Sequence, residues 1–142
     1  MKVSARNIFS GSISAIVPGS VNAEVELTLA GGDKLVAIVT LGSIEALGLA
    51  VGVAASALVK APWVILVTGD SGLRFSARNQ LTGTVSALAK GAVNTEVALT
   101  LDGGTVVHAI ITNEAVLELG LTVGSPATAL IKASHVVLGV PA

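Results

Sequence analysis

Two stretches of sequence decide the fold: Ser4-Ala5-Arg6-Asn7 near the N-terminus and Ser76-Ala77-Arg78-Asn79 in the second half of the chain. The second stretch lies 72 residues after the first (76 − 4 = 72), and later blocks keep the same offset. Pairing residues 1–70 with residues 73–142 gives 32 identities in 70 pairs without a gap. The chain is therefore a tandem duplication, and residues that both copies retain are candidates for a shared task.

The duplication divides the chain into two small copies. We expect copy one over residues 1–68, copy two over residues 73–142, and a linker over residues 69–72, whose Gly-Asp-Ser-Gly sequence is typical of turns. A copy of about 70 residues is small for an independent hydrophobic core. We therefore expect the copies to support each other or a partner chain.

Each copy consists of short β-type segments separated by glycine. Val25, Leu27 and Leu29 alternate with Glu26 and Thr28, the pattern of a half-buried strand. The other expected strands cover residues 8–17, 35–39, 54–59 and 64–67, with matching segments 80–89, 97–101 and 107–111 in copy two. Residues 40–48 and 112–120 indicate one short helix per copy, capped by threonine and ended by glycine. We predict an all-β fold with short helices, arranged as two tandem OB-like β-barrel lobes of five strands each.

The composition bounds the class of protein. The chain has 142 residues, of which 52% are hydrophobic and only 12% charged, about half the roughly 25% charge of an average domain. So much apolar sequence predicts that other subunits cover part of the surface, and we expect an oligomer. The chain has no cysteine, which excludes disulfides and thiolate metal sites.

The ends and the charge balance point to a cytoplasmic protein outside the membrane. Charges within the first six residues argue against a secretory signal. Residues 46–69 are apolar, but Lys60, Pro62 and two glycines interrupt them, so we expect no membrane span. A net charge of −1 offers no broad basic field for a nucleic-acid backbone. Any bound anion is therefore expected to be small.

The basic residues common to both copies suggest an anion site. Lys2 pairs with Arg74, Arg6 with Arg78, and Lys60 with Lys132, whereas Glu24 and Glu96 are the only shared acids. Thr40 and Thr112 would add a hydroxyl beside free N–H groups at a helix start, and Ser43 would add a second hydroxyl. Each feature also has a plain structural interpretation, namely a solvated lysine at a strand end and ordinary helix capping. Hydroxyls, amides and one cation are the donors that suit a tetrahedral oxyanion.

Catalysis finds little support in the sequence, and we expect no enzyme. His108 corresponds to Val36 and His135 to Trp63, so neither histidine belongs to a mechanism common to both copies. No two-histidine metal spacing appears, and we expect no site for a bare metal cation. The OB-like fold keeps a single-stranded nucleic-acid binder as the alternative, although such proteins need stacking aromatics, and this chain has only Trp63, Phe9 and Phe75.

Ordered blocks in both copies resemble a known family. In copy two these blocks are Ser76-Ala77-Arg78-Asn79-Gln80-Leu81-x-Gly83, Gly91-Ala92-Val93-Asn94-Thr95-Glu96-Val97, Thr112-Asn113-Glu114, Leu119-Gly120-Leu121 and Ile131-Lys132-Ala133-Ser134. They resemble the Mop domain of molbindins, in the tandem (di-Mop) arrangement. The resemblance covers nearly the whole chain and implies a cytoplasmic homotrimer of OB-like lobes that binds molybdate, with tungstate as an analogue.

The resemblance also implies where the oxyanion binds. One class of site, between lobes of neighbouring subunits, falls on Ser4, Arg6, Asn7, Thr40, Ser43, Lys60, Ala61, Ser76, Arg78, Asn79, Thr112, Lys132 and Ala133. A second class, near the three-fold axis, falls on Gly19, Val21, Asn22, Gly91, Val93 and Asn94, although these residues also suit plain tight turns. Ala115 replaces the serine expected at the position of Ser43, so sites that use that turn are expected to differ in affinity.

The expected role is storage and homeostasis of the oxyanion. The two expected lobes account for the 142 residues, and we therefore expect no regulatory or transport module among them. We expect no nucleic-acid or membrane partner. An enzyme of molybdenum-cofactor metabolism is a third possibility, but it would need catalytic residues and a pterin pocket that the sequence does not indicate.

Overall fold

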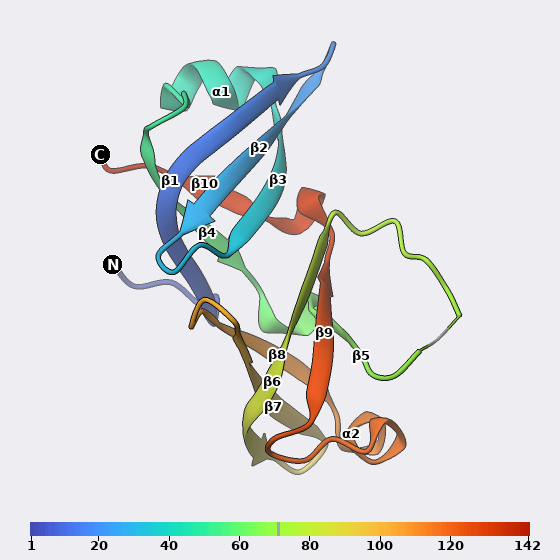
Figure 1. The fold of residues 1–142 in the computed structure, drawn as a ribbon. Helices are drawn as coiled ribbons and strands as arrows, with labels where there is room; N and C mark the ends of the chain where they lie inside the picture. Colours follow the sequence, from blue (N-terminus) through green and yellow to red (C-terminus); the bar gives the residue numbers. More distant parts are fainter. Residues whose placement is uncertain (71) are drawn as a thin grey trace.

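The computed structural model describes residues 1–70 and 72–142, and it folds into two lobes of curled antiparallel sheet (Figure 1). The first copy forms β1 (Asn7–Pro18), β2 (Asn22–Leu29), β3 (Lys34–Thr40), α1 (Leu41–Leu47), β4 (Ala54–Val59), the 3₁₀ turn η1 (Ala61–Trp63) and β5 (Ile65–Val67). The second copy forms β6 (Asn79–Lys90), β7 (Asn94–Leu101), β8 (Val106–Thr112), α2 (Asn113–Leu119), β9 (Pro126–Ile131), the 3₁₀ turn η2 (Ala133–His135) and β10 (Val137–Gly139). The predicted all-β fold with short helices is confirmed.

The two copies exchange their last strands. The first lobe has the strand order β10-β4-β1-β2-β3, and the second lobe has the order β5-β9-β6-β7-β8. The prediction that each copy builds its own five-stranded barrel is therefore wrong in one strand. The physical reason lies in η1 and η2, which turn the chain out of its own lobe so that β5 pairs with β9 and β10 with β4. The domain limits remain a prediction, and the predicted linker 69–72 includes Ser71, which lies outside the described residues.

Alternation along the strands builds the core. Val25 and Leu27 on β2 are fully buried, while Glu26 between them is partly exposed. In the second copy Val97 and Leu99 occupy the same positions and are also fully buried. The predicted facing of this strand pair is therefore confirmed.

A glycine in β1 allows the strong curl of the first lobe. A Cβ atom at Gly11 would overlap the carbonyl oxygen of Thr28 on β2, so no side chain fits there. A β-bulge follows between Ile13 and Ala15, and it increases the local twist. The same combination recurs at Gly83, which explains why both copies retain the glycine.

Each short helix begins and ends where the sequence predicts. The Thr40 side chain accepts a hydrogen bond from the Ser43 amide, and Gly48 ends α1 in the left-handed conformation with φ of 63°. Thr112 and Gly120 do the same for α2. The two helices lie at opposite ends of the molecule (Figure 1). Within the described residues, no helix reaches the length and apolar character that spanning a bilayer requires.

Candidate anion site

Two equivalent pockets each bring together one serine and one lysine that both copies retain. Ser4 and Lys60 line one cavity of about 250 Å³, here called the Ser4–Lys60 pocket. Ser76 and Lys132 line a second cavity of about 250 Å³, here called the Ser76–Lys132 pocket. These residues are related by the 72-residue offset, so each copy contributes one serine and one lysine to a pocket of its own.

Trp63 and His135 connect the two pockets. Trp63 lines both cavities, and its ring centre lies 5.0 Å from that of His135, the equivalent residue of the second copy. Sequence reasoning missed this pair as part of the pockets, and it also missed Phe75. The 72-residue offset could have revealed this pair. Trp63 and His135 each lie two positions after the Lys-Ala motif of their copy.

The lysines reach the pockets because they precede the 3₁₀ turns. Lys60 stands immediately before η1, and Ala61 behind it is buried with 1% exposure. Lys132 and Ala133 repeat this arrangement before η2. Neither lysine forms an ion pair with the residues that the structure describes, so both ammonium groups are available to an anion. Ala61 and Ala133 have no polar side-chain atom, so they could contact an anion only through their backbone amides.

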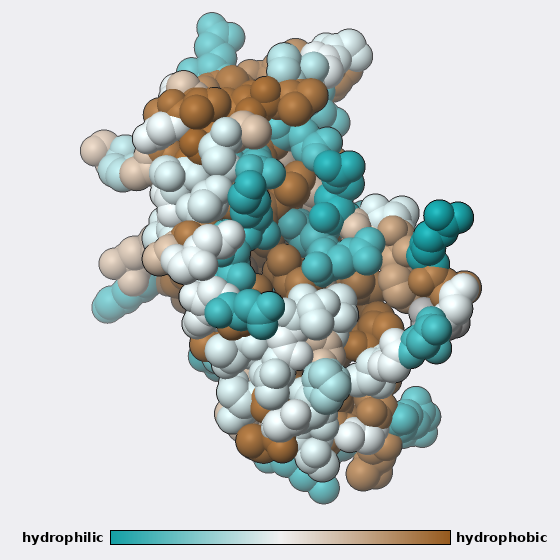
Figure 2. Space-filling model, viewed as in Figure 1, coloured by the Kyte–Doolittle hydropathy of each residue, from teal (hydrophilic) through white to brown (hydrophobic). Residues whose placement is uncertain are grey.

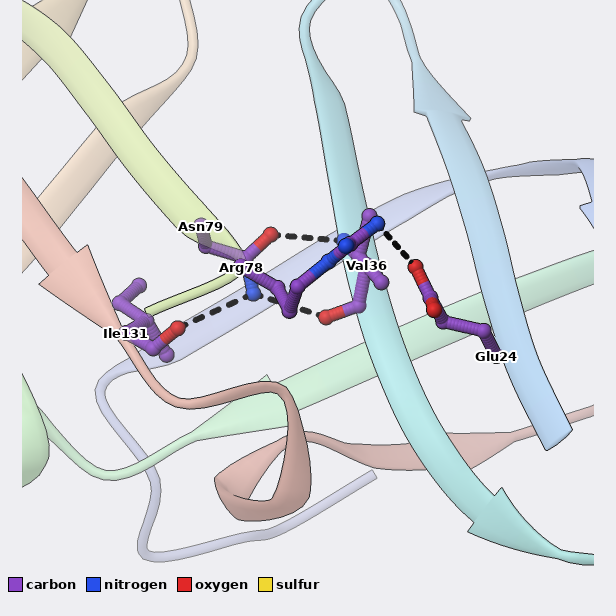
Figure 3. A network of polar contacts seen from close by, with 5 residues as sticks. All are labelled: Glu24, Val36, Arg78, Asn79 and Ile131. Carbon is purple, nitrogen blue, oxygen red and sulfur yellow. Dashed lines mark hydrogen bonds and ion pairs between the residues drawn. The ribbon is translucent and has the colours of Figure 1, made fainter. Parts of the chain in front are cut away.

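The two arginines that both copies retain have different partners. Arg78 forms an ion pair with Glu24 on β2, which places its guanidinium over the first lobe (Figure 3). Arg6 is exposed and has no acidic partner in the described part of the chain. Sequence reasoning assigned both arginines to the anion and did not foresee that Glu24 holds one of them.

The two asparagines that both copies retain form hydrogen bonds between the lobes. Asn79 is 2% exposed and bridges the lobes: its Oδ1 accepts from the Val36 amide at 2.7 Å, and its Nδ2 donates to the carbonyls of Val36 and Ile131 (Figure 3). Asn7 bonds the amide and carbonyl of His108 in the same way, at 2.7 and 2.8 Å. Backbone groups therefore already engage the polar atoms of both side chains, and the assignment of Asn7 and Asn79 to the oxyanion stays a prediction.

The threonine caps lie at the far ends of the lobes, beside α1 and α2. The Thr40 hydroxyl bonds the Ser43 amide at 3.1 Å and the Ser43 hydroxyl at 2.9 Å. Thr112 bonds only the Ala115 amide, at 3.0 Å, because alanine has no hydroxyl. Neither threonine lines the Ser4–Lys60 or the Ser76–Lys132 pocket. Within one chain, the Thr40 and Thr112 hydroxyls therefore do not line the pockets that contain Lys60 and Lys132.

The residues of the second predicted class lie next to the caps. The Val21 carbonyl accepts from the Leu41 amide at 3.0 Å, and Asn22 pairs with Thr40 across the sheet. The Gly19 amide donates to the Asn22 carbonyl at 2.8 Å, so this segment is a tight turn. Gly91, Val93 and Asn94 form the matching turn in the second lobe. The structure thus brings the turn and the cap of each lobe together, and the assignment of the turn to an anion stays a prediction.

The geometry defines a class of protein: a strand-exchanged pair of OB-like lobes, with two related cationic pockets where the lobes meet. The family model "TOBE domain" matches residues 3–66 and 76–138. The chain therefore belongs to the TOBE domain family, in two tandem copies, and the resemblance to Mop-domain proteins is confirmed.

Individual relatives sharpen this placement. The chain is 46% identical over 141 residues to the molybdenum-pterin-binding protein MopA of Rhodobacter capsulatus and 47% identical over 140 residues to the molybdenum transport protein ModE of Herbaspirillum seropedicae. These alignments cover 99% of this chain but 53% and 52% of the relatives, so the chain spans about half their length. A crystal structure of the cytoplasmic molybdate-binding protein ModG with molybdate bound is 59% identical, has a TM-score of 0.94, and is matched over 99% of this chain and 100% of that chain.

Proposed function

We propose that this protein binds molybdate, with tungstate as an analogue, and that it stores and buffers the oxyanion in the cytoplasm without catalysing a reaction. The observation that carries the proposal is the likeness to ModG, whose solved structure holds molybdate and matches this chain along its full length at 59% identity. The pockets with Ser4, Lys60, Ser76 and Lys132 supply part of the set of donors that such a ligand requires.

The pockets suit a small dianion for electrostatic reasons. Each combines one hydroxyl with one ammonium group that forms no ion pair within residues 1–70 and 72–142, in a mostly apolar setting. A hydrogen bond from an ammonium group to an oxyanion is charge-assisted and therefore stronger than one between neutral groups. One cation per pocket does not neutralise a dianion, so the remaining charge requires further donors.

A neighbouring subunit is the source of donors that this proposal favours. The Thr40 and Thr112 caps lie at the lobe ends, away from the lysine pockets of the same chain, so a second copy would be needed to bring both groups to one ligand. Apolar residues are exposed at the same ends, including Val21, Val51 and Val93 at 66–70% exposure. Figure 2 shows hydrophobic side chains gathered over the end of the first lobe that carries α1. Covering these surfaces would stabilise the homotrimer that we propose.

Calorimetric titration tests the proposal. We expect heat from molybdate and tungstate, little from sulfate, and none from a short single-stranded oligonucleotide. Heat from the oligonucleotide without heat from molybdate would favour the OB-type nucleic-acid binder instead. Trp63 is the only tryptophan and lines both pockets, so its fluorescence should change as molybdate binds.

Variants of the two lysines connect binding to the pockets. Lys60→Ala and Lys132→Ala should each weaken molybdate binding about tenfold or more, since a hydrogen bond to a charged group contributes about 1.5–3 kcal/mol. Lys34→Ala is the matched control, because Lys34 pairs with Glu26 and lies outside both pockets. Light scattering should show the same trimer for all three variants. Unchanged molybdate affinity in both the Lys60→Ala and the Lys132→Ala variants would show that these lysines do not bind the oxyanion.

A further inference from the structure

The two pockets are built from equivalent positions of the two copies. Each residue that lines the Ser4–Lys60 pocket has its counterpart, at the 72-residue offset, in the lining of the Ser76–Lys132 pocket. Where the paired residues differ, Val3, Trp63 and Val137 of the first pocket correspond to Phe75, His135 and Ile65 of the second. Of these exchanges, that of Trp63 for His135 introduces a side chain that can carry a charge. The linings of the two pockets therefore differ in ionisable groups at this position.

The imidazole of His135 has no hydrogen-bond partner within residues 1–70 and 72–142. Its Nδ1 atom is buried without a partner, whereas Nε2 is unpaired and reaches solvent. Nδ1 lacks a partner whether or not it carries hydrogen, so its burial penalises both the neutral and the charged ring. A ligand in the pocket that His135 lines would supply the partner that Nε2 lacks.

The charged groups around His135 are mostly basic. His135 forms no ion pair with a carboxylate of the described chain, and Lys132 is the other charged residue in the pocket lining. β3 packs against η2 and carries Lys34 as its charged residue, while η1 and β10 carry none. The charged residues that flank lining residues 75–77 are Arg74, and Arg78 with its partner Glu24. The pocket lining itself therefore offers no carboxylate to offset a charge on the ring.

Trp63 is the aromatic neighbour of His135. The two ring centres lie 5.0 Å apart, within the distance at which an indole attracts a cation over its face. Lys132 opposes an imidazolium by like-charge repulsion, and a dianion bound beside both groups offsets that repulsion. Electrostatics therefore couples the charge on the ring to the presence of an anion in the pocket.

We infer that His135 is a binding residue of the Ser76–Lys132 pocket: Nε2 donates a hydrogen bond to the oxyanion, and the ring takes up a proton from solvent as the dianion binds. This inference rests on the proposed function. In the charged ring both nitrogens carry hydrogen, so the pocket holds the anion with two positive charges. Trp63 occupies the equivalent position in the Ser4–Lys60 pocket and cannot take up a proton. The Ser76–Lys132 pocket therefore loses affinity as pH rises through the range in which histidine changes its charge, about pH 5–8.

Calorimetric titration of each pocket alone tests the inference. In the Lys60→Ala variant only the Ser76–Lys132 pocket keeps its lysine, and its molybdate affinity should fall about three- to tenfold from about pH 6 to about pH 8, because a charged donor forms a hydrogen bond roughly twice as strong as a neutral one. The Lys132→Ala variant is the matched control, since any change in molybdate itself affects both variants alike. Its affinity should change much less, and an equal fall in both variants overturns the inference.

Proton uptake gives a readout that does not depend on lysine variants. Titration of the unaltered chain near neutral pH, in two buffers with different heats of ionisation, measures the protons bound together with molybdate. We expect uptake in the unaltered chain and in His108→Gln, because His108 lies outside both pockets. We expect none in His135→Gln. Molybdate binding without proton uptake by the unaltered chain overturns the inference.

Two substitutions of His135 separate its charge from its packing. In the Lys60→Ala background, His135→Gln keeps a neutral donor, so molybdate affinity should stay near the value expected at about pH 8 and should no longer vary with pH. His135→Phe removes the donor and should weaken binding further. A pH dependence that persists in His135→Gln overturns the role of the imidazole, while the proposed function stands. Absence of molybdate binding by the unaltered chain overturns the proposed function, and with it this inference.

Discussion

The two repeats contact each other through equivalent asparagine-to-backbone hydrogen bonds, but the side chains around these bonds differ. Asn79 makes three hydrogen bonds to the backbone, to Val36 and Ile131, whereas Asn7 makes two, both to His108. Both asparagines are buried, and both copies keep them. Bonds directed at the backbone tolerate a change of side chain at the partner position, which is why Val36 and His108 can differ while the bridge persists.

The outer faces of the sheets have diverged further. In the first lobe the Ser14 hydroxyl donates to Glu26 at 2.8 Å, and Lys34 lies 3.5 Å from the same carboxylate. In the second lobe Ala98 replaces Glu26, and Ser86 retains only the hydrogen bond to the backbone carbonyl of this residue, which Ser14 also donates to Glu26. Glu26 is partly exposed and Ala98 is buried, so the fold tolerates both a charged and a small apolar side chain at this position. The comparison separates what the shared fold requires from what each lobe acquired.

The largest expected effect comes from separating the repeats. Residues 1–68 alone lack β10 and η2, and with them the buried side chains Val136 and Leu138. The remaining sheet has an unpaired edge at β4 and an incomplete small core. We expect no monomer that unfolds cooperatively in urea, as followed by circular dichroism and size-exclusion chromatography.

Co-expression provides the control for this experiment. A second chain of residues 73–142 supplies the missing strand, so the two fragments together should restore a folded complex. A stable, folded monomer of residues 1–68 would show that the strand exchange is not essential to the lobe.

The next effect comes from the buried bridges. Asn79→Ala should lower the free energy of unfolding by about 3–4 kcal/mol and Asn7→Ala by about 2–3 kcal/mol, since each leaves buried backbone groups without a partner at roughly 1–3 kcal/mol per group. The order follows from the additional bond of Asn79 to Ile131. Urea denaturation at a single protein concentration measures both values. A larger loss for Asn7→Ala than for Asn79→Ala would contradict this account of the interface.

A smaller effect is expected at the helix caps. Ser43→Ala should weaken molybdate binding two- to fivefold at sites that use this turn, and Ala115→Ser should strengthen binding at the matching turn, about the effect of one neutral hydrogen bond. The Thr40 cap to the amide of residue 43 does not need the serine side chain, so the helix should persist, as circular dichroism can verify. Equal affinities before and after both changes would exclude the serine hydroxyl from the site.

The smallest effect concerns Glu26. The hydrogen bond from Ser14 lowers the pKa of Glu26, partial burial opposes this shift, and the charge of Lys34 lowers it further. Because the folded pKa is the lower one, the stabilisation is present above the ordinary pKa of the group and is lost as pH falls through the folded pKa. Ser14→Ala should therefore raise the Glu26 pKa, measured by carboxyl NMR titration. Ser86→Ala is the matched control and should leave every carboxyl titration unchanged, because Ala98 stands at the equivalent position.

Much of the local structure followed from the sequence. The alternation of Val25 and Leu27 with Glu26 predicted β2 and its buried face, and the Thr40 and Gly48 signals predicted the limits of α1. These predictions succeeded because periodicity, capping and left-handed turns depend on neighbours within a few residues. The family resemblance likewise came from ordered motifs, and it alone implied that Ser4 and Lys60 belong to one class of site.

The tertiary structure decided the features that join distant parts of the chain. The exchange of β5 and β10, the burial of Asn7 and Asn79, and the capture of Arg78 by Glu24 all involve partners far apart in the sequence. The sequence by itself determined two copies of one β-rich unit and the donors that each copy retains. Only the folded chain decided which donors stay available, because a buried amide or a nearby carboxylate engages a polar group through its position in space and not through its place in a motif.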